Sequence, residues 1–312
     1  MLLIRKGFSW LFYACFIEKK WQIASCKKFS NLSSNISLDL GESDKIPRLA
    51  CVSIMADPVG IYHDKLYAEF VNRFSGIGKI GYLEKGSSSV SYLKLPRLLH
   101  YSFPQILSEN GRNYLFPESS KHSSPMLYEL DDKGEIVNEK LFLRGFSGYR
   151  LIDAILFHLD HVWYLFASIS PEKSGELRLW KSTTLFGEFQ EHENSPIAKD
   201  VRTGRMAGPI YFENGNLYRF AQNSEENYGG SVVILQISQI SESNYKEREI
   251  GSIRVDKAIG PHSIIFDEDE IYFDYYHEKL SLGAGVRRLL PILFHFVYKL
   301  GIFRSRHYSF RV

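Results

Sequence analysis

Hydrophobic and polar residues follow one pattern that recurs five times along this chain. Each copy starts at a polar or small residue, runs through hydrophobic residues to a tight polar turn, and returns through aromatic residues to a second polar residue. The copies start roughly 45–55 residues apart, a period typical of propellers and other repeat arrays. They lie at Asp57–Phe70, Ser102–Glu118, Asp153–Ser168, Gly208–Gln222 and His262–Tyr275.

Each copy predicts a β-hairpin, because apolar residues alternate on both sides of a turn-forming dipeptide. Four of these dipeptides are His63-Asp64, Asn110-Gly111, Asn214-Gly215 and Asp267-Glu268. Five hairpin-centred units of four strands each predict an all-β protein, a five-bladed β-propeller with short helical appendages at its two ends. We expect residues 21–280 to form the propeller.

The amino-acid composition excludes some classes of function and indicates a compartment. Hydrophobic residues make up 44% of the 312-residue chain, which is enough for a large core. The formal net charge of +2 is too small for a general nucleic-acid binder, so we expect no nucleic-acid partner. Three cysteines are too few for a disulfide framework, which favours a reducing compartment and therefore the cytoplasm.

The N-terminal segment, residues 1–20, has two interpretations. Basic residues precede an apolar run from Phe8 to Ile17, and Ile23–Cys26 resembles a lipoprotein cleavage box. However, Glu18, Lys19 and Lys20 interrupt the apolar stretch, where an export signal stays apolar. The alternative is a short helix followed by a strand, Trp21–Ser25, that starts or closes the propeller.

The C-terminal tail, residues 281–312, has a basic and apolar character. From Lys279 onward the chain has seven Lys and Arg residues and no Asp or Glu. The tail predicts an amphipathic helix in which Arg288, Pro291, His295 and Lys299 share one face. Such a helix is too short to span a bilayer, but it can lie on an anionic membrane surface. For a cytoplasmic protein we expect this to be the inner surface of the membrane. The alternative is that it packs on the side of the propeller.

Two polar positions recur among the five copies. The first holds Asp57, Ser102, Asp153, Gly208 and His262, and the second holds Glu69, Glu118, Ser168, Gln222 and Asp274. Because matching positions of successive blades converge on the propeller axis, we expect Asp57 and Asp153 on the same axial face, within roughly 10 Å of each other, with Glu118 beside them. Paired carboxyl groups at such separations suit chemistry on a sugar.

Other signatures are missing from the sequence. It contains no glycine-rich phosphate loop before a helix, no paired cysteines, no HExxH and no GxSxG. The histidines lack metal-ligand spacing. We therefore expect no cofactor and no metal.

Several stretches together resemble a known family in their order and spacing, from about residue 20 to 285. They are Ala56-Asp57-Pro58, His100–Pro104 with Pro117-Glu118, Asp153 with Trp163–Phe166, Arg202–Gly208, Tyr218-Arg219 with Ala221-Gln222, Tyr228–Gly230 and Gly260–His262. They are similar to the propeller domain that precedes the transferase domain of plant glucosamine inositolphosphorylceramide transferases, and to its bacterial relatives. A more distant resemblance is to family 43 glycoside hydrolases, whose first-blade Asp is the general base.

The resemblance implies a carbohydrate-active propeller that binds, and cleaves or transfers, a glycosyl unit. Asp57 would be the base, Glu118 or Asp153 the acid, and the remaining carboxyl would tune the pKa of the acid. The residues expected to bind substrate are His100, Arg205, Arg219, Gln222, Tyr228 and His262. The hydrolase triad is not reproduced in full, because Ser102 and Asp153 stand at the openings of the second and third blades.

Each of these residues also has a structural interpretation. Asp57 before Pro58 can cap a turn, Glu118 can end a surface strand, and His262 can be a core histidine. Arg205 and Arg219 suit either an anionic ligand or ion pairs between blades.

Two further hypotheses remain open. One is a non-catalytic glycan-binding module that works beside a separate glycosyltransferase, with a carbohydrate or glycolipid ligand. The other is a protein-interaction propeller, which would leave the axial carboxylates unexplained.

Overall fold

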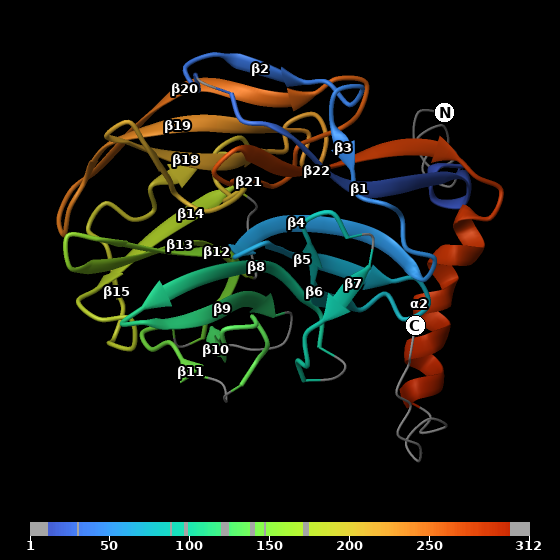
Figure 1. The fold of residues 1–312 in the computed structure, drawn as a ribbon, viewed down its shortest axis with the longest axis horizontal. Coiled ribbons are helices and arrows are strands. Elements are labelled where there is room, and N and C mark those ends of the chain that lie inside the picture. The colour runs from blue at the N-terminus through green and yellow to red at the C-terminus, as the bar shows by residue number, and fades with distance from the viewer. Residues whose placement is uncertain are drawn as a thin grey trace, which may run out of the picture.

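The computed structural model describes residues 12–29, 31–87, 89–96, 99–119, 125–137, 141–146, 148–170 and 175–299. Within them, five separate sheets follow one another around a common axis (Figure 1). Helix is confined to residues 12–16 and to α2 (Ala284–Lys299) in this part of the chain. The predicted five-bladed β-propeller is therefore confirmed.

The first three blades are each built in chain order from the inside outward. Blade one contains β4 (Val52–Tyr62), β5 (Lys65–Asn72), β6 (Gly78–Glu84) and β7 (Val90–Tyr92). Blade two contains β8 (Tyr101–Glu109), β9 (Arg112–Ser119), β10 (Met126–Leu130) and β11 (Leu141–Phe142). Blade three contains β12 (Arg150–Leu159), β13 (Val162–Ser170), β14 (Glu176–Ser182), β15 (Gln190–Glu191) and β16 (Ala198–Lys199), which also pairs with β14.

The last two blades borrow strands from the N-terminal part of the chain. Blade four contains β17 (Tyr211–Glu213), β18 (Asn216–Asn223), β19 (Ser231–Ile240), β20 (Tyr245–Val255) and, parallel to β20, β2 (Asn35–Leu38). Blade five contains β21 (Ile264–Phe266), β22 (Glu270–Leu280), β1 (Ile17–Lys27) and β3 (Asp44–Lys45). Every predicted hairpin is the inner hairpin of one blade.

Blade five closes the ring with strands from both ends of the chain. β1 pairs antiparallel with β22 from Ile17–Leu280 to Lys27–Glu270 without a register shift. The predicted strand Trp21–Ser25 and the residues that resemble a cleavage box, Ile23–Cys26, both lie inside β1. Much of the apolar run predicted from Phe8 lies outside the described residues.

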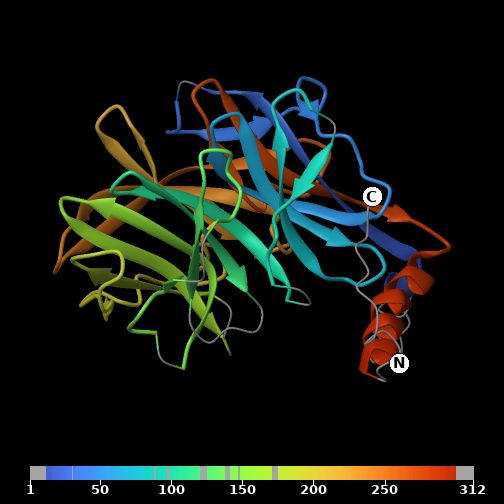
Figure 2. The same cartoon turned by 60° about the horizontal axis from the view of Figure 1, so that its bottom comes forward.

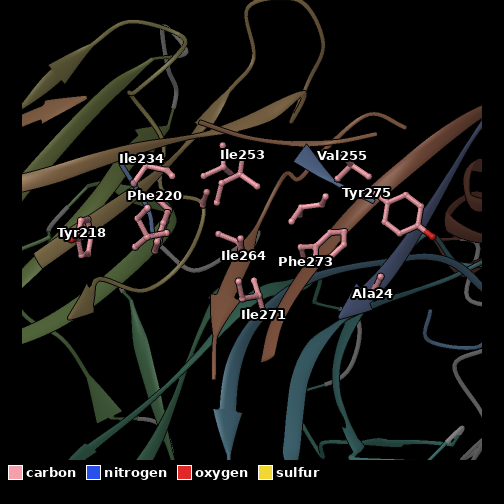
Figure 3. Packing of buried hydrophobic residues seen from close by; sticks show 14 residues of the cluster. Ala24, Tyr218, Phe220, Ile234, Ile253, Val255, Ile264, Ile271, Phe273 and Tyr275 are labelled. Atoms are coloured by element: carbon pink, nitrogen blue, oxygen red, sulfur yellow. The ribbon is translucent and has the colours of Figure 1, made fainter. Parts of the chain in front are cut away.

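The hydrophobic core is divided into one main cluster at each junction between blades. The junction of blades four and five, for example, packs Phe220 and Ile234 against Ile264 and Phe273 (Figure 3). Ile23 of β1 packs with Phe70 and other side chains of blade one. Each blade is thus apolar on both faces, which explains why the inner hairpins are rich in aromatic and β-branched residues.

Arg219 lies inside the junction of blades three and four. This position corrects the prediction that Arg219 binds substrate, because its side chain is fully buried. Its fully buried guanidinium donates to both carboxylate oxygens of Glu247 at 2.7 and 2.6 Å and to the carbonyl of Thr203 at 3.0 Å. The partner belongs to the same blade, so this is a structural ion pair within blade four. Charge this deep in a core is retained because both partners are satisfied.

The C-terminal helix α2 stands at the side of the propeller (Figure 2). The predicted helix is present, with Pro291 in its interior. The last basic residues of the tail, Arg304, Arg306 and Arg311, lie outside the described residues.

We expect Arg219→Met to reduce the free energy of unfolding by about 3 kcal/mol, because it leaves the largely buried Glu247 carboxylate with the Tyr245 hydroxyl but without its cation. The measurement is urea denaturation. The control is Arg202→Met, which removes the partner of Glu249, an exposed residue on the same strand β20 as Glu247, and should cost at most about 1 kcal/mol. A loss below about 1 kcal/mol for Arg219→Met would contradict the assignment.

Candidate functional site

Three inner strands carry the same irregularity near the axis. The pairing of β4, β8 and β12 with the following strand breaks after Ala56, Ser102 and Ile152. The next residue in each strand adopts a left-handed backbone: Asp57 at φ 52°, Phe103 at 49° and Asp153 at 48°. Bulges of this kind redirect a side chain and are frequent beside functional sites.

This register corrects one predicted equivalence. Ser102 pairs with Glu118 as Ala56 pairs with Glu69, so Ser102 corresponds to Ala56 and Phe103 corresponds to Asp57. The comparison of the repeats by sequence aligned Ser102 with Asp57, whereas the strand pairing aligns it with Ala56, one residue earlier. The bulges that set this register leave no signal in the residue types. Two blades, rather than three, therefore present a polar side chain at the bulge.

The second recurring position lies on the second strand of each blade, as Glu69, Glu118, Ser168, Gln222 and Asp274. Two of these side chains hold the bulge of the next blade: Asp274 Oδ2 accepts the Asp57 N–H, and Glu118 Oε2 accepts the Asp153 N–H, both at 3.0 Å. Asp57 Oδ2 in turn accepts the Phe103 N–H at 3.3 Å. Hydrogen bonds to carboxylates thus link blades five, one, two and three around the axis.

One half of the site is a buried group of Asp57, His262 and Asp274. His262 Nδ1 lies 3.3 Å from Asp57 Oδ1 and 3.2 Å from Asp274 Oδ2. Burial opposes a charged imidazole, but Tyr228 and Asp274 outweigh it and raise the pKa of His262 well above its ordinary value. The raised pKa favours the protonated imidazole of His262, which lies between two carboxyl groups.

The two carboxyl groups beside His262 differ in their proton affinity. Burial raises the pKa of Asp57, and the opposing effect of His262 does not cancel it. Burial alone would also raise the pKa of Asp274, but His262 and nearby N–H groups outweigh burial and lower the pKa of that carboxyl group. Asp274 is therefore the fixed counter-ion of His262, and Asp57 is the group that can exchange a proton.

The same three residues offer donor atoms within 4.8 Å of one another, close enough to hold a metal ion. Asp274, however, already accepts hydrogen bonds from the N–H groups of Asp57, His262 and Ser263 and from the Ser263 hydroxyl. When protonated, His262 supplies the positive charge that a metal would bring. The geometry therefore allows a cation without requiring one.

The other half of the site surrounds Asp153. Arg205 donates to Asp153 Oδ2 through Nε at 2.8 Å and Nη2 at 2.6 Å, and Gln222 Nε2 donates to the same oxygen at 2.9 Å. Burial alone would lower the pKa of Arg205, but the Asp153 carboxylate outweighs burial and raises it. The Arg205 side chain is partly exposed, so it can also contact a ligand.

Glu118 lies next to this group and is largely buried. Burial, with the negative charge of Asp153 as the second cause, raises its pKa to about 7. The Arg150 side chain is partly exposed, and its Nη2 lies 3.5 Å from Glu118 Oε1. Glu118 lines a small hollow between blades two and three, together with Tyr101, Phe116, Tyr128 and Leu151. A carboxyl group in these surroundings can act as a proton donor near neutral pH.

Tyr228 joins the two halves at the surface. Its hydroxyl lies 3.1 Å from His262 Nε2, and the Arg205 guanidinium lies 5.7 Å from the centre of its ring. Tyr228 is 46% exposed, whereas Asp57, Asp153 and His262 are buried. The charge of Asp153 also raises the pKa of Asp57, so the two halves interact electrostatically.

His100 forms a third pair with Glu69. The Gly78 N–H donates to His100 Nδ1 at 3.0 Å, which leaves the proton of the neutral ring on Nε2, 2.8 Å from Glu69 Oε1. Hydrogen bonding to Glu69 raises the pKa of His100, and burial raises the pKa of Glu69. His100 is partly exposed and remains a candidate ligand contact.

The structure thus gathers Asp57, Glu118, Asp153, His100, Arg205, Gln222, Tyr228 and His262 near the axis and separates Arg219 from them. Four further residues of the site were not among the predicted site residues: Glu69, Phe103, Arg150 and Asp274. Glu69 and Asp274 carried a signal, since both occupy the second recurring position. Phe103 and Arg150 carried none, because only the bulge and the neighbouring blade bring them to the site.

Comparison with known proteins agrees with this architecture. Residues 51–261 match the family described as glucosamine inositolphosphorylceramide transferase 1, N-terminal. The proteins of that name from Arabidopsis thaliana and Oryza sativa subsp. japonica are 28% and 29% identical over 64% and 62% of this chain. The chain spans only 27% and 28% of their lengths.

A solved structure shares the fold. The β-xylosidase RS223 superposes with a TM-score of 0.50 at 12% identity, covering 66% of this chain and 79% of the xylosidase chain. At this identity the likeness concerns the fold alone.

We expect Glu118 to titrate near pH 7, against 4.5 for an ordinary Glu. A folded-state pKa above the unfolded one means that the stability associated with the protonated carboxyl is complete below about pH 4.5 and is lost as the pH rises through 7. Glu118→Gln, which mimics the protonated form, should therefore gain stability over the parent chain by up to about 3 kcal/mol between these two pH values.

The measurement is urea denaturation across that pH range, together with carbon-13 NMR of the Glu carboxyl groups. Glu268→Gln, which removes a carboxyl group from an exposed turn, is the control. A Glu118 midpoint near 4.5 would overturn the assignment.

Proposed function

We propose, from the premise that this chain belongs to the family of the N-terminal part of glucosamine inositolphosphorylceramide transferase 1, that its axial site binds a glycosyl unit. The curated relatives are glycosyl-transfer proteins by name, and the fold is that of a β-xylosidase. Carbohydrate is the ligand class that these two likenesses have in common.

The observation that carries the proposal is the position of Tyr228. It is an exposed aromatic ring at the mouth of a buried polar group, with Arg205 beneath its ring and His262 at its hydroxyl. A sugar presents an apolar face to an aromatic ring and hydroxyl groups to charged partners, so both sides of the ligand are matched.

One buried oxygen supports a hydroxyl-rich ligand. Gln222 Oε1 accepts no hydrogen bond from the part of the chain that the structure describes, whereas Asp57 Oδ1 faces the His262 ring at 3.3 Å. Buried acceptors are normally satisfied, and sugar hydroxyl groups are donors that can satisfy them. The partly exposed guanidinium groups of Arg150 and Arg205 add contacts for an anionic substituent, such as the phosphate of an inositol-phosphate headgroup.

The same site suits acid–base chemistry. Glu118, with its pKa at about 7, would donate a proton to a departing glycosidic oxygen, and Asp57 would accept one from the attacking hydroxyl group. Asp153 would raise the pKa of Glu118 by its negative charge, and Arg205 would keep Asp153 ionised. The competing proposal is a glycan-binding module without catalysis, beside a separate glycosyltransferase.

We expect the chain to bind glucosamine or inositol 1-phosphate, probes chosen from the name of the relatives, and Tyr228→Ala to weaken binding about 10-fold. Isothermal titration calorimetry gives the affinity. Tyr92→Ala is the matched control, since Tyr92 is an exposed tyrosine on the outer strand β7. The proposal would be wrong if neither probe binds, or if Tyr92→Ala weakens binding as much as Tyr228→Ala does.

Catalysis is tested separately with Glu118→Gln and a panel of aryl glycosides. If Glu118 is the acid, turnover falls as the pH rises above about 7 and disappears in the variant, while probe binding is retained. Binding without turnover in the parent chain would favour the non-catalytic module.

A further inference from the structure

The outer face of α2 is a row of exposed apolar side chains. Val286, Leu289, Ile292, Leu293 and Phe296 are each more than half exposed. Their spacing of three and four residues places them on one stripe along the 16-residue helix. A contiguous apolar stripe of this kind is unusual on a protein surface that faces only water.

The opposite face of α2 is fixed to the propeller. Ala284 is buried, Arg287 forms an ion pair with Glu18 at 2.8 Å, and Pro291 lies against Gly76 of blade one. Arg288 donates to main-chain carbonyls of Tyr13 and Ile17 at 3.0 and 2.6 Å. The helix is therefore held in one orientation beside the propeller (Figures 1 and 2). Its apolar stripe is exposed on the face that these contacts leave free.

Positive charge borders the stripe. Lys279 and Arg288 form no ion pair within the described residues, and no Asp or Glu occurs from Lys279 to the end of the sequence. The residues after α2 add Arg304, Arg306 and Arg311 in the sequence. A second copy of the chain would bring the same positive charges against each other, whereas an anionic surface would complement them.

No helix in the described part of the chain is long and apolar enough to span a bilayer. An α-helix of 16 residues is about 24 Å long, shorter than the hydrocarbon layer of about 30 Å. An apolar stripe bordered by basic residues on such a helix is typical of helices that lie in the membrane interface.

We propose that α2 is an interfacial anchor that docks the propeller onto a bilayer of anionic lipids. The apolar stripe inserts between the headgroups, and the exposed Lys279 contacts the lipid phosphates. Arg288, whose guanidinium is held by main-chain carbonyls, adds its positive charge to the attraction. The rigid attachment of α2 to blades one and five gives the docked propeller a defined orientation on the membrane.

The test is flotation of the full chain with vesicles of phosphatidylcholine alone or with about 30% phosphatidylglycerol, at low and high salt. We expect binding to the anionic vesicles that weakens with salt. Leu289→Gln with Phe296→Gln should reduce the bound-to-free ratio at least about 10-fold, because two exposed apolar side chains lose their burial in lipid. The thermal midpoint should not change, because neither side chain belongs to the core.

The matched control is Val137→Gln with Phe212→Gln, which changes two equally exposed apolar residues on other blades. It should bind vesicles like the parent chain. Three outcomes would overturn the proposal: no binding to anionic vesicles, equal binding by the Leu289/Phe296 variant, or a dimer by light scattering that this variant dissociates. The last outcome would identify the stripe as an interface between two copies.

Discussion

The pairing of β1 with β22 is the interaction on which the rest of the structure depends. It unites residues from the two ends of the described chain in one blade, so that blade five presents complete faces to blades four and one. Without β1, Ile23 would leave the core that it shares with Phe70, and the ring would end in an open strand edge. The closure therefore stabilises every junction between blades, because each main cluster of the core contains side chains from two neighbouring blades.

The candidate site depends directly on that closure. Asp274 and His262 come from the last blade and Asp57 from the first, and they meet only because these two blades are adjacent. Around the axis, a carboxylate on one blade accepts the main-chain N–H of the next, so the positions of the acidic groups and the packing of the blades are coupled. Carboxyl groups held this firmly are pre-organised, and their different surroundings set different proton affinities.

The site and α2 suggest one arrangement for the whole molecule. The axial site opens where Tyr228 is exposed, while α2 is attached beside blades one and five. A propeller that is anchored through α2 would hold its axial site at a constant height and angle relative to the bilayer. That geometry suits a ligand whose sugar is part of a lipid headgroup.

The sequence by itself determined the number of blades, the inner hairpins and most of the axial residues. It did so because strand alternation, turn dipeptides and a recurring polar position are local patterns that repeat with the fold. Tertiary structure alone decided which residues share the axis. The bulges moved the equivalence from Ser102 to Phe103, and burial in a blade junction turned Arg219 from a candidate ligand contact into the partner of Glu247. Arg150 and Phe103 reach the site through a neighbouring blade, and the proton affinities of Asp57 and Glu118 depend on burial and on charges from other blades. These are properties of side chains far apart in the sequence, so no local pattern can contain them.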